Sequence, residues 1–362
     1  MPKPHHHLLL AAALALAGCA GQDEVVGVPD PAYEPVSTTP LVTVVFGQNG
    51  LGDRSYNDLI NQGVERTALE LGLRTMQVSP PTTAQGLASL EQLFAQIETV
   101  PDTVRRLIIV TSPIYDAYLR ANSHRLESNP YAQLLYLETD RPLPHKGATL
   151  YMPYYGAMFE AGTLYRTLPG NSLMVVGANR HTPSVTDAIR GFADGFESQL
   201  LRPSASTYSV CYLDSVGQGG FSLPDTTALR LMSQWDAQGY NMLLPICGSG
   251  FNTFERLNAI QFWYWMLIGI DIPYQMQFSI FSVFKHTDRA VQHCIRQWLS
   301  AQGLPKHQVL GLAEGYTGVY HNYRNYDYGS EEPFASFTAD TIARLHAEAI
   351  RKETEYEGRK QP

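Results

Sequence analysis

The sequence has little of what marks several protein classes. It contains four cysteines in 362 residues, no run of Lys and Arg, and 34 acidic against 26 basic side chains. The resulting net charge of -8 argues against nucleic acid as a partner. No Gly-x-Ser-x-Gly elbow, Walker loop, His-Glu-x-x-His pair or His/Cys cluster at metal spacing occurs, so we predict no catalytic residue, metal site or cofactor. A hydrolase is therefore the least favoured hypothesis.

The N-terminal apolar run is too short to cross a membrane as a helix. It extends from Leu8 to Ala17, about ten residues, which fits the hydrophobic region of a signal peptide. The run ends in Leu16-Ala17-Gly18-Cys19, which resembles a bacterial lipobox. We therefore predict a signal peptide and lipobox at residues 1–19 and a lipid on Cys19, which would anchor the protein to a membrane of the bacterial cell envelope. The alternative is an ordinary secretory signal with a chance cysteine.

Lipidation of Cys19 would leave three cysteines, Cys211, Cys247 and Cys294. An odd number in an exported protein permits at most one disulfide. Cys211 and Cys247 lie in successive predicted strands and are the candidates for a bridge. We favour buried free thiols, because disulfide geometry is strict and the sequence cannot test it.

The hydrophobic pattern alternates between strands and helices after a polar tether at residues 20–40. Strands are predicted at residues 41–46, 75–78, 107–110, 134–137, 173–177, 208–213, 242–247, 266–270, 278–284, 309–313 and 319–323. Helices are predicted at residues 56–71, 86–97, 160–168, 185–200, 288–299 and 337–355, with others between the strands.

Two such series predict an α/β fold, with two doubly wound parallel-sheet lobes around a hinge and a cleft between them. Lobe 1 is expected at residues 41–150, with part of 285–330 returning to it. Lobe 2 is expected at residues 151–284, and residues 331–362 should form a C-terminal helix. Open parallel sheets bind ligands at the carboxyl ends of their strands, so the candidate functional residues are those that follow strands.

The stretch from Gly47 to Asn57 is glycine-rich and lies between a predicted strand and a predicted helix. Ser55 and Asp58 have the spacing of a capping box, which would begin the helix. Tyr56 and Asn57 would then lie on its first turn, where an aromatic ring and an amide can stack on and hydrogen-bond a planar heterocycle. The alternative, a helix start and nothing more, explains Ser55 and Asp58 but not the glycines.

Three further motifs also follow predicted strands. Gly248-Ser249-Gly250 begins like a dinucleotide fingerprint but lacks the third glycine, and it can equally be a turn that needs small residues. Asp271 follows an apolar strand and could accept hydrogen bonds from two neighbouring hydroxyls, or could cap the next turn. Lys285 ends an extended run, and its alternative is a solvated surface lysine.

Taken together, these motifs resemble the basic membrane protein family of lipoproteins, the nucleoside-binding subunits of ABC transporters. The family's signature, Asp-x-Gly-Gly-Ile-x-Asp-Lys-Ser-Phe-Asn, is similar to residues 47–57. Its order is kept by further segments between Leu41 and Asn322, namely Glu160-Ala161-Gly162, Pro183 with Gly191-Phe192 and Gly195, Gly269-Ile270-Asp271 and Ser282-Val283-Phe284-Lys285. The resemblance implies a type I periplasmic-binding-protein fold, a nucleoside-like ligand and an ABC permease as partner.

The resemblance also implies roles for individual residues. Tyr56 would replace the family's Phe as a stacking face, and Asn57 would keep its amide contact. Asp271 would hold ribose hydroxyls, Lys285 would face the same cleft, and Phe221 is the candidate for the second aromatic ring. The glycines at 248 and 250 would let the backbone approach the sugar. The candidate ligand-binding residues are Asn49, Asp53, Tyr56, Asn57, Phe221, Gly248, Gly250, Asp271 and Lys285.

The sequence departs from the family at the position of its base-contacting Asp, which is Gly47 here, with Asn49 or Gln48 as substitutes. The loop after Asp271 is altered as well, so the resemblance does not imply a purine. Together with the Tyr-rich segment 316–328, the change at Gly47 motivates an alternative function. In that alternative, the same fold serves as a ligand sensor or interaction module with altered or lost nucleoside binding.

Overall fold

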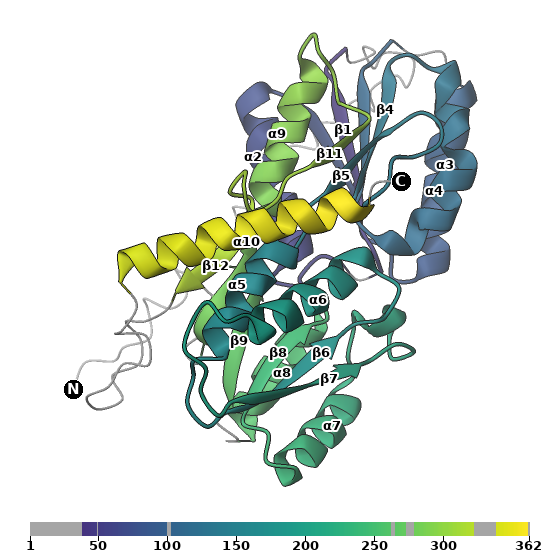
Figure 1. Ribbon diagram of the computed structural model, residues 1–362. Helices are drawn as coiled ribbons and strands as arrows, with labels where there is room; N and C mark the ends of the chain where they lie inside the picture. The colour runs from purple at the N-terminus through teal and green to yellow at the C-terminus, as the bar shows by residue number, and fades with distance from the viewer. Residues whose placement is uncertain are drawn as a thin grey trace, which may run out of the picture. The chain divides into compact units, whose positions relative to one another are not determined.

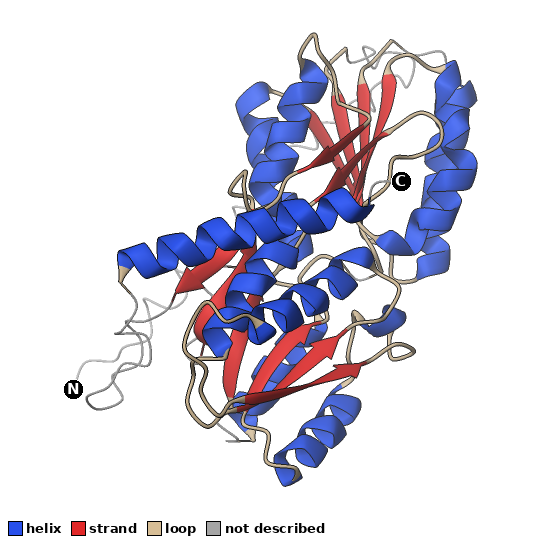
Figure 2. Ribbon diagram, viewed as in Figure 1, coloured by secondary structure: helices blue, strands red, loops and turns tan. Residues whose placement is uncertain are grey.

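Two six-stranded sheets, each flanked by helices, make up the described part of the chain (Figures 1 and 2). The computed structural model describes residues 38–48, 50–99, 103–261, 265–272, 279–321 and 338–360. Within Thr38–Pro362, which forms one compact unit, the two sheets define lobe 1 and lobe 2. The predicted signal peptide, Cys19 and most of the predicted tether lie outside the described residues.

The sheet of lobe 1 is parallel throughout and has the strand order β11-β5-β4-β3-β1-β2. Its strands are β1 (Leu41–Val45), β2 (Arg74–Val78), β3 (Arg106–Val110), β4 (Ala132–Leu137), β5 (Ala148–Tyr151) and β11 (His307–Val309). Its helices are α2 (Tyr56–Leu71), α3 (Thr83–Thr99), α4 (Asp116–Asn122) and α9 (Thr287–Leu299), with short 3-10 turns at Pro113–Tyr115 and Ser123–Ser128. Separate apolar clusters cover the two faces, which explains why β1 and β3 are continuous apolar runs.

The sheet of lobe 2 has the order β12-β10-β9-β8-β6-β7 and is parallel except for the pair β10–β12. Its strands are β6 (Ser172–Gly177), β7 (Thr207–Tyr212), β8 (Met242–Ile246), β9 (Met266–Asp271), β10 (Ser279–Lys285) and β12 (Thr317–His321). Its helices are α5 (Tyr155–Tyr165), α6 (Pro183–Glu197), α7 (Asp225–Ala237) and α8 (Gly250–Ile260), with a 3-10 turn at Gln218–Gly220. The C-terminal helix α10 (Ala339–Lys360) packs on α5. The predicted α/β fold of two lobes is confirmed.

The chain passes between the lobes three times. Residues 152–154 lead from β5 to α5, His286 joins β10 to α9, and residues 310–316 lead from β11 to β12. The predicted strand 309–313 is therefore wrong beyond Val309, because this segment crosses between the lobes instead of pairing in a sheet. The backbone N–H of His286 donates to the carbonyl of Tyr316 at 2.8 Å, which joins the second crossover to the third.

Helices α5 and α6 meet backbone to backbone. A Cβ at Gly162 would overlap the carbonyl oxygen of Phe192, and one at Gly195 would overlap that of Phe159. The Gly-Phe-x-x-Gly segment thus serves helix packing inside lobe 2. Every residue of α5 is buried, so the helix has no polar face and no clear period, and its start was predicted five residues too late, at Glu160. No helix in the described ranges has the length and apolar character needed to span a bilayer.

Candidate functional site

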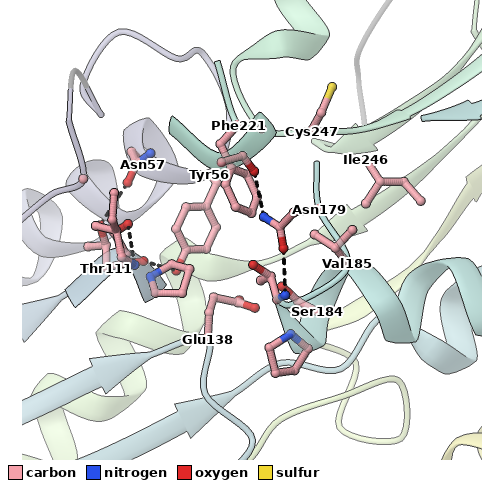
Figure 3. A pocket seen from close by; sticks show the side chains of 18 of the residues that line it. Tyr56, Asn57, Thr111, Glu138, Asn179, Ser184, Val185, Phe221, Ile246 and Cys247 are labelled. Atoms are coloured by element: carbon pink, nitrogen blue, oxygen red, sulfur yellow. Dashed lines mark hydrogen bonds between the residues drawn. The ribbon is translucent and has the colours of Figure 1, made fainter. Parts of the chain in front are cut away.

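A cavity of about 510 Å³ lies between the lobes and is lined by residues of both (Figure 3). Lobe 1 contributes the segments that follow β1, β3 and β4, and lobe 2 contributes those that follow β6, β7, β8 and β9. These are carboxyl ends of parallel strands, where backbone groups and short polar side chains converge. Of the predicted site residues, the cavity wall includes Asp53, Tyr56, Asn57, Phe221, Gly248, Asp271 and Lys285.

The N-terminus of α2 is capped by Asp53, two residues before the predicted cap. Its carboxylate accepts from the backbone N–H groups of Ser55, Asn57 and Asp58 at 2.9–3.1 Å and from the side-chain amide of Asn57. Burial raises the pKa of Asp53, and these hydrogen bonds oppose the rise. The predicted capping box is wrong, because Ser55 makes no cap bond and Asp58 accepts from the N–H groups of Gly52 and Arg54.

Tyr56 and Asn57 line the lobe 1 wall and are held by the segment that follows β3. The Tyr56 hydroxyl donates to the carbonyl of Thr111 at 3.1 Å, and the Thr111 hydroxyl donates to the Asn57 Oδ1 at 3.0 Å. Burial raises the pKa of Tyr56 well above its usual range, so the phenol stays neutral. Both ends of the Asn57 amide are used within the protein, whereas the Tyr56 ring faces the cavity (Figure 3).

Asp271 joins the two lobes at the cavity. Its carboxylate accepts from the Ser55 hydroxyl of lobe 1 at 2.9 Å and from the Tyr154 hydroxyl of the first crossover. The residue is 7% exposed and has a backbone φ of 68°, a conformation that L residues rarely adopt. A carboxylate has about four lone-pair positions, so two hydroxyl donors leave room for donors from a ligand.

Lys285 and Glu138 form a buried ion pair across the cleft. The Lys285 Nζ donates to both carboxylate oxygens of Glu138 at 2.9 Å and lies 4.0 Å from the centre of the Tyr154 ring. Lys285 is 2% exposed, so the solvated alternative is wrong. Burial raises the pKa of Glu138, and the nearby Lys285 opposes that rise. The sequence reasoning missed Glu138, although it directly follows β4 as Asp271 ends β9.

Phe221 and Gly248 form part of the lobe 2 wall. Phe221 follows the turn after β7 and lines the cavity together with Tyr56 of lobe 1 (Figure 3). Gly248 has φ of 54°, and a Cβ there would lie 3.2 Å from the Phe221 ring. Gly250 begins α8, where a Cβ would meet Cys247 and Leu223, and it is not part of the cavity wall.

Gly47 lies close to Ser112 and has little room for a side chain. A Cβ on Gly47 would lie 3.0 Å from the Ser112 Oγ, too close for an undisturbed contact. Gln48, one of the two expected substitutes, lines the cavity and accepts from the Thr83 hydroxyl at 3.4 Å. Asn49 lies outside the described residues.

Asn179 is a further cavity residue, and its polar atoms have partners within the protein. Asn179 lines the cavity, but its amide accepts from the N–H of His181 and Thr182 and donates to the Gly219 carbonyl, so it shapes the wall.

Cys211, Cys247 and Cys294 are free. The bridge between Cys211 and Cys247, the less favoured alternative, is absent because β6 separates their strands.

Comparison with known proteins identifies relatives by structure alone. No protein-family model matches the chain, and no curated protein matches it in sequence. An ABC transporter solute-binding protein from Aeropyrum pernix K1 superposes with a TM-score of 0.62 at 18% identity, covering 88% of this chain and 92% of that one. A transcriptional activator of the comK gene from Bacillus halodurans gives 0.60 at 14% identity, covering 86% and 96%. The glucose-galactose binding protein GanP from Geobacillus stearothermophilus gives 0.55 at 14% identity, covering 81% and 99%. The chain therefore has the two-lobed α/β fold of the type I periplasmic binding proteins.

Proposed function

We propose that the chain is the substrate-binding protein of an ABC importer and captures a nucleoside-like molecule between its lobes. The observation that carries the proposal is a cavity of about 510 Å³ whose opposing walls combine the rings of Tyr56 and Phe221 with the buried carboxylate of Asp271. Cavities of this size hold small organic ligands. The similarity to solute-binding proteins of ABC transporters from Aeropyrum pernix K1 and Conexibacter woesei DSM 14684 supports the same role.

In this proposal each wall recognises a different part of the ligand. A planar base would stack on Tyr56 and Phe221, which is favourable for any heterocycle of suitable width. Sugar hydroxyls would donate to Asp271, joining or replacing the donors Ser55 and Tyr154. Closure of the lobes would exclude water and strengthen these hydrogen bonds. The chain would bind its ligand without changing it, so chromatography should recover every bound nucleoside intact.

A thermal-shift panel of nucleosides, free bases and sugars tests the ligand class. A ligand present at 100 times its Kd should stabilise the protein by about 2.7 kcal/mol. The variant Asp271→Asn should weaken binding about 10- to 100-fold, because a hydrogen bond to a charged group contributes about 1.5–3 kcal/mol. The control Asp225→Asn removes an exposed carboxylate outside the cavity wall and should bind normally. The absence of a shift with every compound in the panel would refute the proposal.

As part of the importer role, we propose that a lipid on Cys19 keeps the protein beside its permease. Two tethered partners meet at a higher effective concentration than free ones, which would aid delivery of the ligand. Mass spectrometry of the membrane-bound protein should find an acylated Cys19 at the N-terminus. The variant Cys19→Ala should appear in the soluble fraction, and its retention in the membrane would contradict lipid anchoring.

The contacts within the cleft favour a second candidate, a ligand sensor or interaction module of the same fold. Asp271 and Lys285 have partners across the cleft within the protein itself, Ser55 and Glu138. The similarity to a transcriptional activator of the comK gene supports a sensor as well. A neighbouring permease and ATPase gene pair would favour the importer, whereas a neighbouring receptor kinase gene would favour the sensor.

A further inference from the structure

The C-terminal helix α10 contacts the segments that cross between the lobes. Its buried Glu353 accepts at one carboxylate oxygen from the backbone N–H of Gly156 at 2.7 Å, and at the other from the N–H of Leu312 at 2.8 Å. Gly156 follows the first crossover and Leu312 lies in the third. One carboxylate thus joins the start of α5, directly after the first crossover, to the third crossover, and the third crossover in turn binds His286 of the second.

The surroundings of Glu353 are shaped for its carboxylate. A Cβ on Gly156 would lie 2.8 Å from one carboxylate oxygen, and a Cβ on Gly311 would overlap the other. Glu353 is 6% exposed. Glycines at both positions therefore make room for a side chain that comes from a distant part of the sequence.

The last two turns of α10 continue these contacts into both lobes. The Tyr356 ring stacks on Tyr155 with centroids 4.1 Å apart, and its hydroxyl donates to Asp187 of α6 at 2.9 Å. Lys360 also pairs with Asp187. The same carboxylate accepts from the hydroxyl of Tyr151, the last residue of β5 in lobe 1.

The first half of α10 is fixed to lobe 2 alone. Leu345 and Ala349 belong to the apolar core of that lobe, and His346 contacts Glu160 of α5 at 3.1 Å. Figure 1 shows α10 running across α5. The first half of α10 is therefore attached to lobe 2, whereas Glu353 in its second half contacts the start of α5 and the third crossover, which leads back from lobe 1. A rotation of the lobes has to change the backbone at these crossovers.

We propose that α10 sets the equilibrium between open and closed lobes, with Glu353 as the positioning residue that holds the start of α5 and the third crossover in the arrangement seen here. The proposal rests on the proposed function only for its ligand readout, because lobe separation can be measured without ligand. If α10 holds the closed arrangement, weakening it shifts the population toward open lobes and lowers apparent ligand affinity by the same factor.

The charge on Glu353 provides a specific readout. Burial raises its pKa to about 7, with smaller contributions in the same direction from Glu357 on α10 and Glu314 on the third crossover and an opposing one from the N–H groups of Leu312 and Gly156. Opening would hydrate the carboxylate, so its ionisation above about pH 7 should favour open lobes, and the neutral acid should favour closed ones.

Two variants and one control test this role in the full chain. Glu353→Gln is neutral at every pH and has one acceptor oxygen for two N–H groups. Tyr356→Phe removes only the hydroxyl that reaches Asp187. Glu348→Gln changes a carboxylate on the same helix that pairs with Arg351 at the surface. Spin labels at Leu69→Cys on α2 and Ser233→Cys on α7, in a Cys211→Ser background, report the distance between lobes.

In the protein with a native Glu353, the fraction with a long label distance should rise as the pH passes from about 6 to about 8. Glu348→Gln should keep this response, and Glu353→Gln should lose it. Tyr356→Phe should give a larger fraction with the long label distance at both the low and the high pH. Hydrogen exchange at the Gly156 or Leu312 amide should be about 10-fold faster in Glu353→Gln, with β1 and β8 unchanged. A pH response that persists in Glu353→Gln would overturn the proposal. So would exchange rates at the Gly156 and Leu312 amides that are the same in Glu353→Gln as in the native protein.

For any ligand that the thermal-shift panel identifies, Glu353→Gln should alter affinity without altering the ranking of compounds, because it does not line the cavity. If no compound binds, the proposed function fails, whereas the distance and exchange measurements still decide the role of α10.

Discussion

The cleft and the hinge hold buried carboxylates in two different ways. In the cleft, Glu138 faces the ammonium group of Lys285 at 2.9 Å. At the hinge, Glu353 accepts from the N–H groups of Gly156 and Leu312, and the carboxylates of Glu357 and Glu314 lie nearby. Separating a buried carboxylate from the cation that pairs with it costs much free energy, because the charge is left without a partner. A carboxylate held by amides has no compensating charge, so its protonation state changes near neutral pH.

The largest expected effect comes from removing the cation in the cleft. Lys285→Met should destabilise the protein by about 3–5 kcal/mol, because it leaves Glu138 buried without a counter-charge. Urea unfolding gives the change. The double variant Lys285→Met with Glu138→Gln removes both charges and should regain much of the loss. A double variant no more stable than Lys285→Met would show that the pair is not the source of the effect.

The hinge should show a smaller effect that depends on pH. The pKa of Glu353 is about 7 in the folded protein against an ordinary value of 4.5, so the neutral acid stabilises the fold. This contribution is fully present below about pH 4.5 and is lost as the pH rises to about 7, a change of about 3 kcal/mol. The native protein should lose stability between about pH 5 and pH 8. The loss should be about 3 kcal/mol smaller in Glu353→Gln. Glu348→Gln serves as the control and should retain the native difference.

A third prediction compares two side chains at the start of α2. Asp53→Ala removes the carboxylate that accepts from three backbone N–H groups and should cost about 1–2 kcal/mol. Ser55→Ala removes only the hydrogen bond to Asp271 and should cost about 1 kcal/mol or less. Thermal unfolding of both variants measures the difference. A larger loss in Ser55→Ala would restore the predicted capping role of that serine.

The smallest expected effect separates the ring of Tyr56 from its hydroxyl. Tyr56→Phe loses the hydrogen bond to the Thr111 carbonyl and should cost about 1 kcal/mol in stability, with ligand affinity unchanged. Tyr56→Ala also removes the stacking face and should weaken a planar ligand about 10-fold or more. Isothermal titration with a compound from the panel distinguishes them. Equal affinity in the two variants would show that the ring does not contact the ligand.

Elements with a clear period or apolar run were predictable from the sequence. The strands β1, β3 and β8 are buried on both faces, and their runs of Val, Leu and Ile placed them within one residue or so at each end. Asp271 was expected at the cavity because it follows an apolar strand at the carboxyl edge of a parallel sheet, whereas Lys285 was placed there only by the family resemblance. The start of α5 was not predictable, because a helix buried on all sides shows no amphipathic period.

What the sequence could not show is which polar groups find each other across the fold. Lys285 and Glu138 are 147 positions apart, and Glu353 and Gly156 are 197 apart. Neither pair has a local motif. The exchange of roles between Asp53 and Ser55 has a similar cause, because a serine engaged by Asp271 of the other lobe is no longer available as a cap.

The close approach of Gly47 to Ser112 links the evolutionary history of these two positions. A Cβ at position 47 would lie 3.0 Å from the hydroxyl oxygen of Ser112, so a larger residue there requires the Ser112 side chain to shift. A lineage that gains a side chain at position 47 therefore needs a compensating change at residue 112, whereas the loss of one needs none. Substitutions at the two positions should accordingly occur together among relatives of this chain.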